Sequence, residues 1–579
     1  MDADRTGVRT PVKLHLSYPC HPAPIREPAT SDFGSAPSRS RAPRKFLPIT
    51  TERPRTGRIV TASAKGDRGN LEFRSAIGLL GIVLAAIAAQ LNDAVLNTAL
   101  SDVAGNIGLS EDTATWLQTL FITGQVLGMC SSPSLGIGLS FRRFALFAVF
   151  MNCFPALLMT LGGYNGGAVL TLRFLEGLGA GFTIPLILTI ALRTVGPGVR
   201  LYALSVYAMT ATLTPNLATS FAGLWIDGVR DWHFVFLQPL PFCALAAICI
   251  WWGLPAEEGE IDRLKKFDWP GLLFVATGWG SLTIVFEQGD RLDWFNSPLI
   301  IVLTLLAAVS LPALFISERF AKVPLMKFSL LKEGNLAYPV LTLILFLVLA
   351  LTASTVPVSF LEQVQGYKPL QAHTVTLIVA LPQFVLLPLT AWILDHRHID
   401  ARWVNTTGYV LVIVACLGCA QLTSSWNRDQ FYLWQIVQSV GFAFIVMPIL
   451  MIATNAIEVD EAPYGSALVN TPRAVAEGIG VWAIELIARW RGGLHRDRIV
   501  DLVGQNRLTL EQLHLLPTTA TEGPDTVYAT INGEITRQVA TLTTIDTYVL
   551  LGSIAIVLMI ALWTIPHRTY PPRIALAES

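Results

Sequence analysis

An arginine inside an apolar run is the strongest candidate for chemistry in this sequence. Arg173 lies within residues 167–192, a run long enough to cross a membrane as a helix. An arginine near the middle of such a helix costs about 2.5–3.5 kcal/mol on insertion scales, so a function or a partner must offset it. Glu176 follows three residues later on the same helix face. We expect Glu176 either to pair with Arg173, which we favour, or to carry a proton itself; a purely structural ion pair is the alternative.

Three glycines follow the arginine and predict tight helix packing. Gly177 and Gly181 are four residues apart, and Gly179 lies between them. Glycines at this spacing let a second helix approach the backbone closely.

Charged residues at the predicted inner ends of spans are candidates for gating. Arg142 and Arg143 precede the third apolar run, and Asp395 and Arg397 close the tenth. We expect these residues to form a cytoplasmic gate or simply to anchor the helix ends.

A carboxyl group and a fixed cation together could couple transport to protons. Desolvation raises the pKa of a carboxyl group and a nearby cation lowers it, so the two tune each other. Arg173 cannot lose its proton and suits the role of the fixed cation. Asp93, in the outer part of the first apolar run, is the best carboxyl candidate. The alternative is a hydrated carboxylate near a helix end.

The thirteenth apolar run carries a second pair, Arg473 and Glu477, with Asn470 nearby. An arginine four residues before a glutamate is the weaker orientation for helix stability. We expect either a polar face that binds substrate or a buried structural ion pair.

Polar, aromatic and proline residues in other runs could line a substrate cavity. Trp116, Gln118, Phe182 and Phe444 suit a cavity for amphipathic organic compounds, and each could equally face lipid. Pro215 lies within the fifth run, where a proline can kink a helix and permit rocking.

The composition is that of a polytopic membrane protein. Of 579 residues, 52% are hydrophobic and only 14% are charged, whereas soluble domains carry about 25% charged residues. The zero net charge argues against a nucleic-acid partner. Six of the seven cysteines lie in apolar runs, so we expect neither a disulfide nor a metal site. The sequence shows no metal cluster, nucleophile motif or phosphate loop, so we do not expect an enzyme.

We predict an all-α fold with fourteen membrane-spanning helices. The predicted spans cover residues 76–99, 114–137, 144–162, 167–192, 201–225, 233–254, 270–288, 299–317, 336–360, 371–394, 403–422, 432–454, 464–488 and 546–566. Lys and Arg concentrate in alternate loops, and the positive-inside rule therefore places both termini in the cytoplasm. The acidic stretch 456–463 is the one exception among the predicted cytoplasmic loops.

Three segments lie outside the predicted spans. Residues 1–74 predict a disordered basic cytoplasmic tail, and 568–579 a second, short one. The outer stretch 489–545 is the one long connection, and its apolar positions between 527 and 542 predict an amphipathic helix leading into the last span. That stretch either only caps the mouth of the protein or docks a partner.

A faint internal repeat indicates two related halves. Glu176–Ala191 echoes Gln438–Ala453, and each segment has small residues followed by a proline. Related halves are typical of transporter folds. We therefore expect two six-helix bundles, 75–254 and 336–567, joined by two additional spans within 255–335.

Three motifs and one loop carry a resemblance to a known family; the loop is the long outer stretch before the last span, with Gln538 in an Ile-Thr-Arg-Gln segment. Leu91–Leu100, followed by Thr113–Trp116, is similar to a first-span motif L-D-x-T-I-V-N-x-A-L-P with A-T-W after it; it includes Asn92, where the motif has Asp, and Asn97. Arg173–Gly181 is similar to a fourth-span motif R-x-x-Q-G-x-G-A-G. Thr214–Gly223 falls where the same family has a fifth-span antiporter motif, of which only Pro215 and Gly223 remain. The chain thus resembles the fourteen-span drug:proton antiporters of the major facilitator superfamily, the EmrB/QacA type.

The resemblance implies proton-coupled export of small organic or amphipathic compounds across the inner membrane by alternating access. It implies a role for Arg173 in proton coupling, a proton gradient in place of any cofactor, and contacts with membrane lipid. It also implies a periplasmic membrane-fusion adaptor as a possible partner of 489–545. The altered fifth-span motif leaves open an uptake or uniport carrier for a metabolite. A non-transporting membrane receptor or scaffold is a third alternative, against which the presence of Arg173 and Asp93 argues.

Overall fold

The computed structural model describes residues 73–161, 166–196, 198–332, 336–397, 399–505 and 524–564. Every regular element within these ranges is a helix. The chain divides into two units, Met1–Gly66 and Asp67–Ser579, and all the described helices belong to the second. The predicted tails lie outside the described residues, except that the first helix begins at Phe73.

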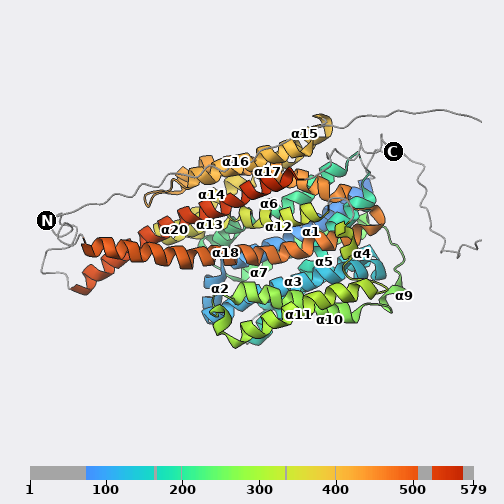
Figure 1. Ribbon diagram of the computed structural model, residues 1–579. Coiled ribbons are helices and arrows are strands. Elements are labelled where there is room, and N and C mark those ends of the chain that lie inside the picture. Colours follow the sequence, from blue (N-terminus) through green and yellow to red (C-terminus); the bar gives the residue numbers. More distant parts are fainter. Residues whose placement is uncertain are drawn as a thin grey trace, which may run out of the picture. The chain divides into compact units, whose positions relative to one another are not determined.

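Helices occupy all fourteen predicted spans. The bounds of the helices are α1 Phe73–Thr98, α2 Leu100–Ile107, α3 Glu111–Leu139, α4 Phe141–Thr160, α5 Gly166–Thr194, α6 Arg200–Gly223, α7 His233–Leu237, α8 Pro239–Gly253, α9 Ile261–Leu264, α10 Trp269–Gln288, α11 Pro298–Phe320, α12 Ala337–Ala350, α13 Thr355–Gln365, α14 Pro369–Ala380, α15 Gln383–Arg397, α16 Ala401–Cys419, α17 Arg428–Asn455, α18 Ala462–Gln505 and α20 Pro524–Leu562. Four short helical turns connect some of these helices: η1 Leu224–Val229, η2 Trp294–Asn296, η3 Phe328–Lys332 and η4 Val459–Glu461. Figure 1 shows how the helices are arranged.

Twelve of the described spans are long and apolar enough to cross a membrane on their own composition. The spans α6 and α18 fall outside this group because they carry polar residues, among them Thr214, Asn470 and Arg473, which are buried in the protein interior. Helices are the expected form for such runs, because lipid offers no partner to backbone N–H and C=O groups. The structure therefore confirms an all-α polytopic membrane protein.

The two predicted halves repeat one pattern of helix contacts. In the first set, α5 packs on α1, α3 and α4, while α8 packs on α1 and α4. In the second set, α17 packs on α12, on α14 with α15, and on α16, while α20 packs on α12 and α16. Counted along the chain, α5 and α17 are each the fourth membrane span of their set. The segments that echo each other in sequence thus lie on equivalent helices.

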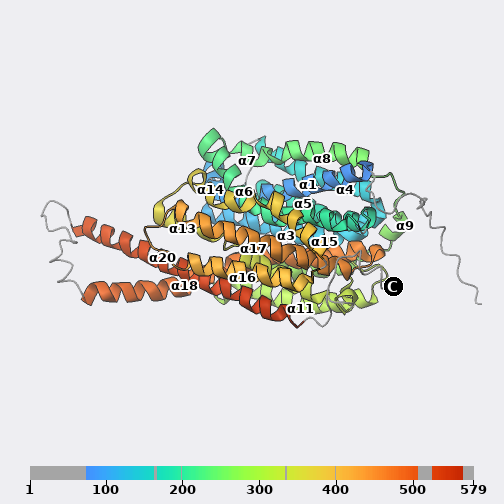
Figure 2. The same ribbon diagram turned by 90° about the horizontal axis from the view of Figure 1, so that it is seen from above.

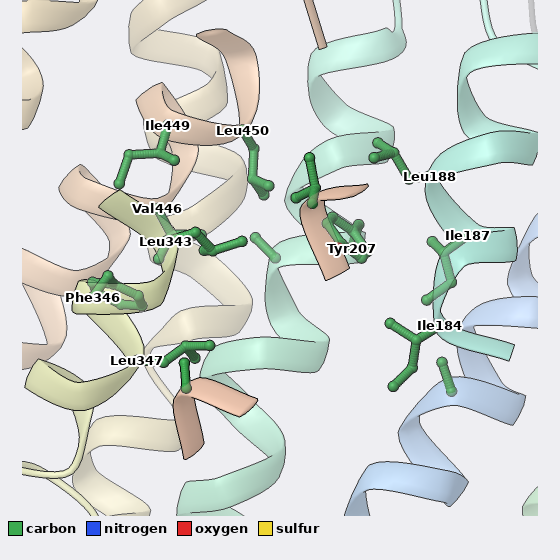
Figure 3. Close-up of a cluster of buried hydrophobic side chains, with 14 of the residues drawn as sticks. Ile184, Ile187, Leu188, Tyr207, Leu343, Phe346, Leu347, Val446, Ile449 and Leu450 are labelled. Atoms are coloured by element: carbon green, nitrogen blue, oxygen red, sulfur yellow. The ribbon is translucent and has the colours of Figure 1, made fainter. Parts of the chain in front are cut away.

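The two sets meet through α3, α5 and α6 on one side and α14, α15, α17 and α18 on the other. Apolar side chains from α5 and α6 face those from α12 and α17, as Figure 3 shows. Buried hydrogen bonds join the sets; among them, Tyr207 donates to Asn470 Oδ1 at 2.6 Å, and Ser466 donates to the Pro185 carbonyl at 2.7 Å.

The additional pair, α10 and α11, packs together at the edge of the helices, and α10 also contacts α3 and α18. The linker beside this pair explains the acidic exception at 456–463. Lys327 donates to the Glu461 carboxylate, and Arg263 of α9 donates to the Tyr464 hydroxyl. One acid of the loop, Glu461, is therefore paired with a linker cation, and a second linker cation contacts Tyr464 just after the loop.

Much of the stretch 489–545 is helical. The span predicted to end at residue 488 continues as α18 to Gln505, and α20 runs unbroken from Pro524 to Leu562, which confirms the predicted helix leading into the last span. Figures 1 and 2 show α18 and α20 projecting beyond the other helices, at the end opposite α9. Asp546 holds the two helices together there by accepting from Arg491 at 2.6 Å and from His495 at 2.7 Å.

Candidate functional site

A buried charge cluster joins the first and fourth spans. Arg173 and Glu176 are fully buried on α5, and Asp93 on α1 is 7% exposed. The Arg173 guanidinium donates from Nη1 to Glu176 Oε2 at 2.7 Å and from Nη2 to Asp93 Oδ1 at 3.2 Å. Asn92 donates its amide to the other oxygen of Glu176. The predicted pairing of Arg173 with Glu176 is thus present, and Asp93 joins it from 80 residues away.

The aromatic ring of Phe121 completes this cluster. The guanidinium carbon of Arg173 lies 4.2 Å from the centroid of that ring. A cation stacked on an aromatic face and bonded to two carboxylates is held in one orientation. Arg173 is therefore a fixed point charge in the interior of the protein.

The glycines of α5 make this geometry possible. A Cβ atom on Gly177 would collide with the carbonyl oxygen of Phe121, and one on Gly181 with that of Gln125. A Cβ on Gly179 would lie 2.5 Å from the backbone nitrogen of Asn152 on α4. The predicted close approach is confirmed: α3 and α4 both press against the backbone of α5, and Arg173 lies one turn away.

Asp93 faces a cavity of about 400 Å³ between the two sets of helices. Its walls come from α1, α3, α5 and α6 in the first set, from α12, α13 and α18 in the second, and from α10. The polar and charged side chains in these walls include Gln90, Asp93, Asn97, Gln118, Gln125, Glu287, Glu362, Arg473 and Glu477. Apolar groups such as Met129 and Leu347 complete them. A cavity of a few hundred Å³ with apolar walls and a few polar groups is typical of small-molecule sites.

Half of the residues predicted to line the cavity do so. Asn97, Gln118, Pro215, Arg473 and Glu477 are in its walls. Arg473 donates to Gln90 Oε1 at 3.2 Å, and no ion pair within 4.0 Å joins it to Glu477 in the described part of the chain. The polar face of α18 that carries Arg473 and Glu477 is therefore available to bind a ligand.

The other five residues predicted for the cavity lie elsewhere. Asn92 is buried behind Asp93, and Asn470 joins the two sets of helices. Phe182 packs on α4, with its ring 5.3 Å from that of Phe144, so its prediction as a cavity residue was wrong. Trp116 and Phe444 are not among the described residues that line the cavity either. Spacing along one helix does not reveal which side faces a neighbour, and this is why the aromatic predictions failed.

The predicted gating residues lie at helix ends. Arg142 stacks on Trp251 of α8, with its guanidinium carbon 4.4 Å from a ring centroid, and Arg143 is exposed. Asp395 is buried near the end of α15. The side chain of Arg397 lies outside the described residues. Their roles in gating stay predictions.

Sequence reasoning missed four amide and acidic residues of the cavity: Gln90, Gln125, Glu287 and Glu362. Glu287 had a usable signal, because it is a carboxylate within a predicted span and such residues are rare in lipid. Gln125 is 4% exposed, and its Oε1 accepts no hydrogen bond in the described part of the chain.

Comparison with known proteins finds a matching family model and several relatives that cover most of the chain. A family model described as the Major Facilitator Superfamily matches residues 82–481. The probable multidrug resistance protein EmrY of Escherichia coli (strain K12) is 24% identical over 493 residues, which cover 84% of this chain and 94% of that protein. The fatty acid resistance protein FarB of Neisseria gonorrhoeae is 27% identical over 79% of this chain and 90% of its own length. The multidrug export protein EmrB of Escherichia coli (strain K12) is 24% identical over 73% and 82%.

Solved structures share the fold. A POT family transporter in complex with 5-aminolevulinic acid has a TM-score of 0.53 at 12% identity, covering 84% of this chain and 95% of its own. The proton:xylose symporter XylE, bound to 6-bromo-6-deoxy-D-glucose, has a TM-score of 0.50 at 12% identity, covering 88% and 100%. At these identities the likeness concerns the arrangement of helices alone.

Proposed function

The chain belongs to the Major Facilitator Superfamily, and from this premise we propose that it exports small amphipathic organic compounds across the inner membrane in exchange for protons. It is a transporter and not an enzyme. Export is supported by the relatives, two of which are named for multidrug resistance or export. One central cavity between two sets of helices suits alternating access, in which the sets rock around a fixed site.

The position of Asp93 carries the proposal of proton coupling. Glu176 is fully buried and receives hydrogen bonds from Arg173 and Asn92, so it is a fixed partner. Asp93 is the member of the cluster that also lines the cavity. With the Asp93 and Glu176 carboxylates both ionised, the cluster has one positive and two negative charges. One proton on Asp93 makes the cluster neutral. A proton that Asp93 takes up from the cavity would therefore leave the cluster without net charge, because the Arg173 cation still balances the Glu176 carboxylate.

The outward projection of α18 and α20 supports a second part of the proposal. Trp490, at 71% exposure, and Val500, at 48%, lie on the part of α18 beyond the predicted span. We propose that this part of 489–545 docks a periplasmic adaptor, and that both termini lie in the cytoplasm. The charge distribution of the loops supports that orientation.

Substrate-induced proton movement in proteoliposomes tests the proposal. Wild type and Asp93→Asn would be compared with a panel of lipophilic cations, dyes and weak organic acids, and Asp102→Asn, an exposed acid beyond the end of α1, serves as the matched control. We expect a pH change with wild type and the control that disappears with Asp93→Asn. Substrate flux without proton movement would instead indicate a uniporter. Absence of flux for every compound would favour a receptor or scaffold.

A further inference from the structure

The additional helix α10 reaches the central cavity. Its penultimate residue, Glu287, lines that cavity together with residues of both six-helix sets. Neighbouring side chains fix the end of α10: Gln288 donates to Thr119 of α3 at 2.6 Å, and the ring of Phe286 lies 5.5 Å from that of Trp482 on α18. Helix α10, which lies between the two six-helix sets in the sequence, thus also forms part of the cavity wall.

The carboxylate of Glu287 rests on the backbone of α18 beside Glu477. A Cβ atom on Gly478 would collide with Glu287 Oε1, so the glycine leaves the space that this carboxylate occupies. Within the described residues Glu287 has neither a cation within 4.0 Å nor a hydrogen-bond donor. Glu477 likewise has no such partner there. Two carboxyl groups therefore lie in one cavity wall, and neither forms an ion pair with a cation of the described residues.

The charge of the cavity as a whole has the same sign. Its walls hold four carboxyl groups, Asp93, Glu287, Glu362 and Glu477, and one guanidinium, that of Arg473. Asp93 is also bonded to Arg173, so the other three acids share a single guanidinium. A buried acceptor adds to this, because Gln125 lines the cavity at 4% exposure with an Oε1 that no described group bonds. Unpartnered acceptors and carboxylates inside a membrane protein call for a positively charged ligand.

We propose that Glu287 and Glu477 form a cation-binding subsite, by which α10 selects positively charged substrates. The ligand is an organic cation whose apolar body lies against Met129, Ile184 and Leu347 and whose charge lies between the two carboxylates. The inference rests on the proposed export function and names the substrate class. It also assigns a binding role to a helix outside the two six-helix sets.

Paired probes of opposite charge test the subsite. Tetraphenylphosphonium and tetraphenylborate have nearly the same shape and apolar surface, so their difference in affinity for the purified full chain reports the charge of the site. Wild type is expected to bind the phosphonium at least tenfold more tightly than the borate. Because one charged contact is typically worth a factor of about ten to a hundred in affinity, Glu287→Gln should weaken phosphonium binding by about that factor and leave borate binding unchanged or tighter.

Two further variants separate binding from folding. Gly478→Ala keeps every charge but displaces the Glu287 carboxylate, and should weaken phosphonium binding in the same direction. Asp102→Asn removes an exposed acid that does not line the cavity and should change it less than threefold. Wild-type affinity for the phosphonium in Glu287→Gln, or a wild-type chain that fails to prefer the phosphonium, would overturn the subsite. Binding does not require transport, so a selective chain without proton movement would refute the antiport proposal and leave the subsite standing.

Discussion

Replacing Arg173 by lysine isolates the contribution of the guanidinium fork. The side chain keeps its positive charge but has one ammonium in place of the two nitrogens that bond Glu176 at 2.7 Å and Asp93 at 3.2 Å. A lysine also loses the planar stack on Phe121. The shorter reach of a single ammonium favours Glu176, which lies on the same helix, so Asp93 is the partner that is released.

The size of the effect follows from that one bond. A hydrogen bond to a charged group contributes about 1.5–3 kcal/mol, which corresponds to a factor of roughly 10–150 in an equilibrium constant. We therefore expect coupled transport by Arg173→Lys to fall by about tenfold or more, while the protein still inserts and purifies. Arg173→Met should behave differently, because two buried carboxylates without a cation cost about 3–5 kcal/mol and should lower the amount of folded protein.

Substrate-driven proton flux, normalised to protein in the vesicles, is the measurement. Arg428→Lys, on an exposed residue at the start of α17, is the matched control and should transport like wild type. Proton flux in Arg173→Lys equal to that of the control would refute the reasoning and remove Arg173 from the coupling mechanism.

Two further substitutions test the packing and the linker. Gly177→Ala forces a methyl group against the carbonyl oxygen of Phe121, so the free energy of unfolding should fall by about 1–3 kcal/mol and the unfolding midpoint with it. Gly533→Ala meets no atom within 4 Å, and because alanine favours a helix over glycine it should not lower the midpoint. Lys327→Glu should lower the transport rate by repelling Glu461, and the added change Glu461→Lys should restore it; failure of the double variant to recover would show that this pair does not control the rate.

The sequence alone predicted the local chemistry of the cluster better than its surroundings. Glu176 follows Arg173 by three residues, and the geometry of a helix places side chains at that spacing next to each other. Asp93 is a candidate for a different reason, since proton coupling needs a carboxyl group that can titrate near a fixed cation. The rotation of each helix about its own axis depends on neighbours that no local pattern encodes. Phe182 was therefore assigned to the cavity although it faces α4, and Glu287 was overlooked although it faces the cavity.

The contacts also explain why the first-span motif departs from the family pattern. The resembling motifs have Asp at the position of Asn92 and Gln at the position of Glu176, so the acid and the amide are exchanged between the two helices. The exchange occurs across a direct hydrogen bond, from the Asn92 amide to the Glu176 carboxylate. An acid at both positions would place two carboxylates in contact at the buried end of Arg173. Asn92 avoids this repulsion, and the carboxylate that faces the cavity is supplied by the next residue, Asp93, which still reaches the guanidinium. This chain thus has one acid on each helix around Arg173, where the motifs have an acid on the first span and an amide on the fourth, and its first-span acid stands one position later.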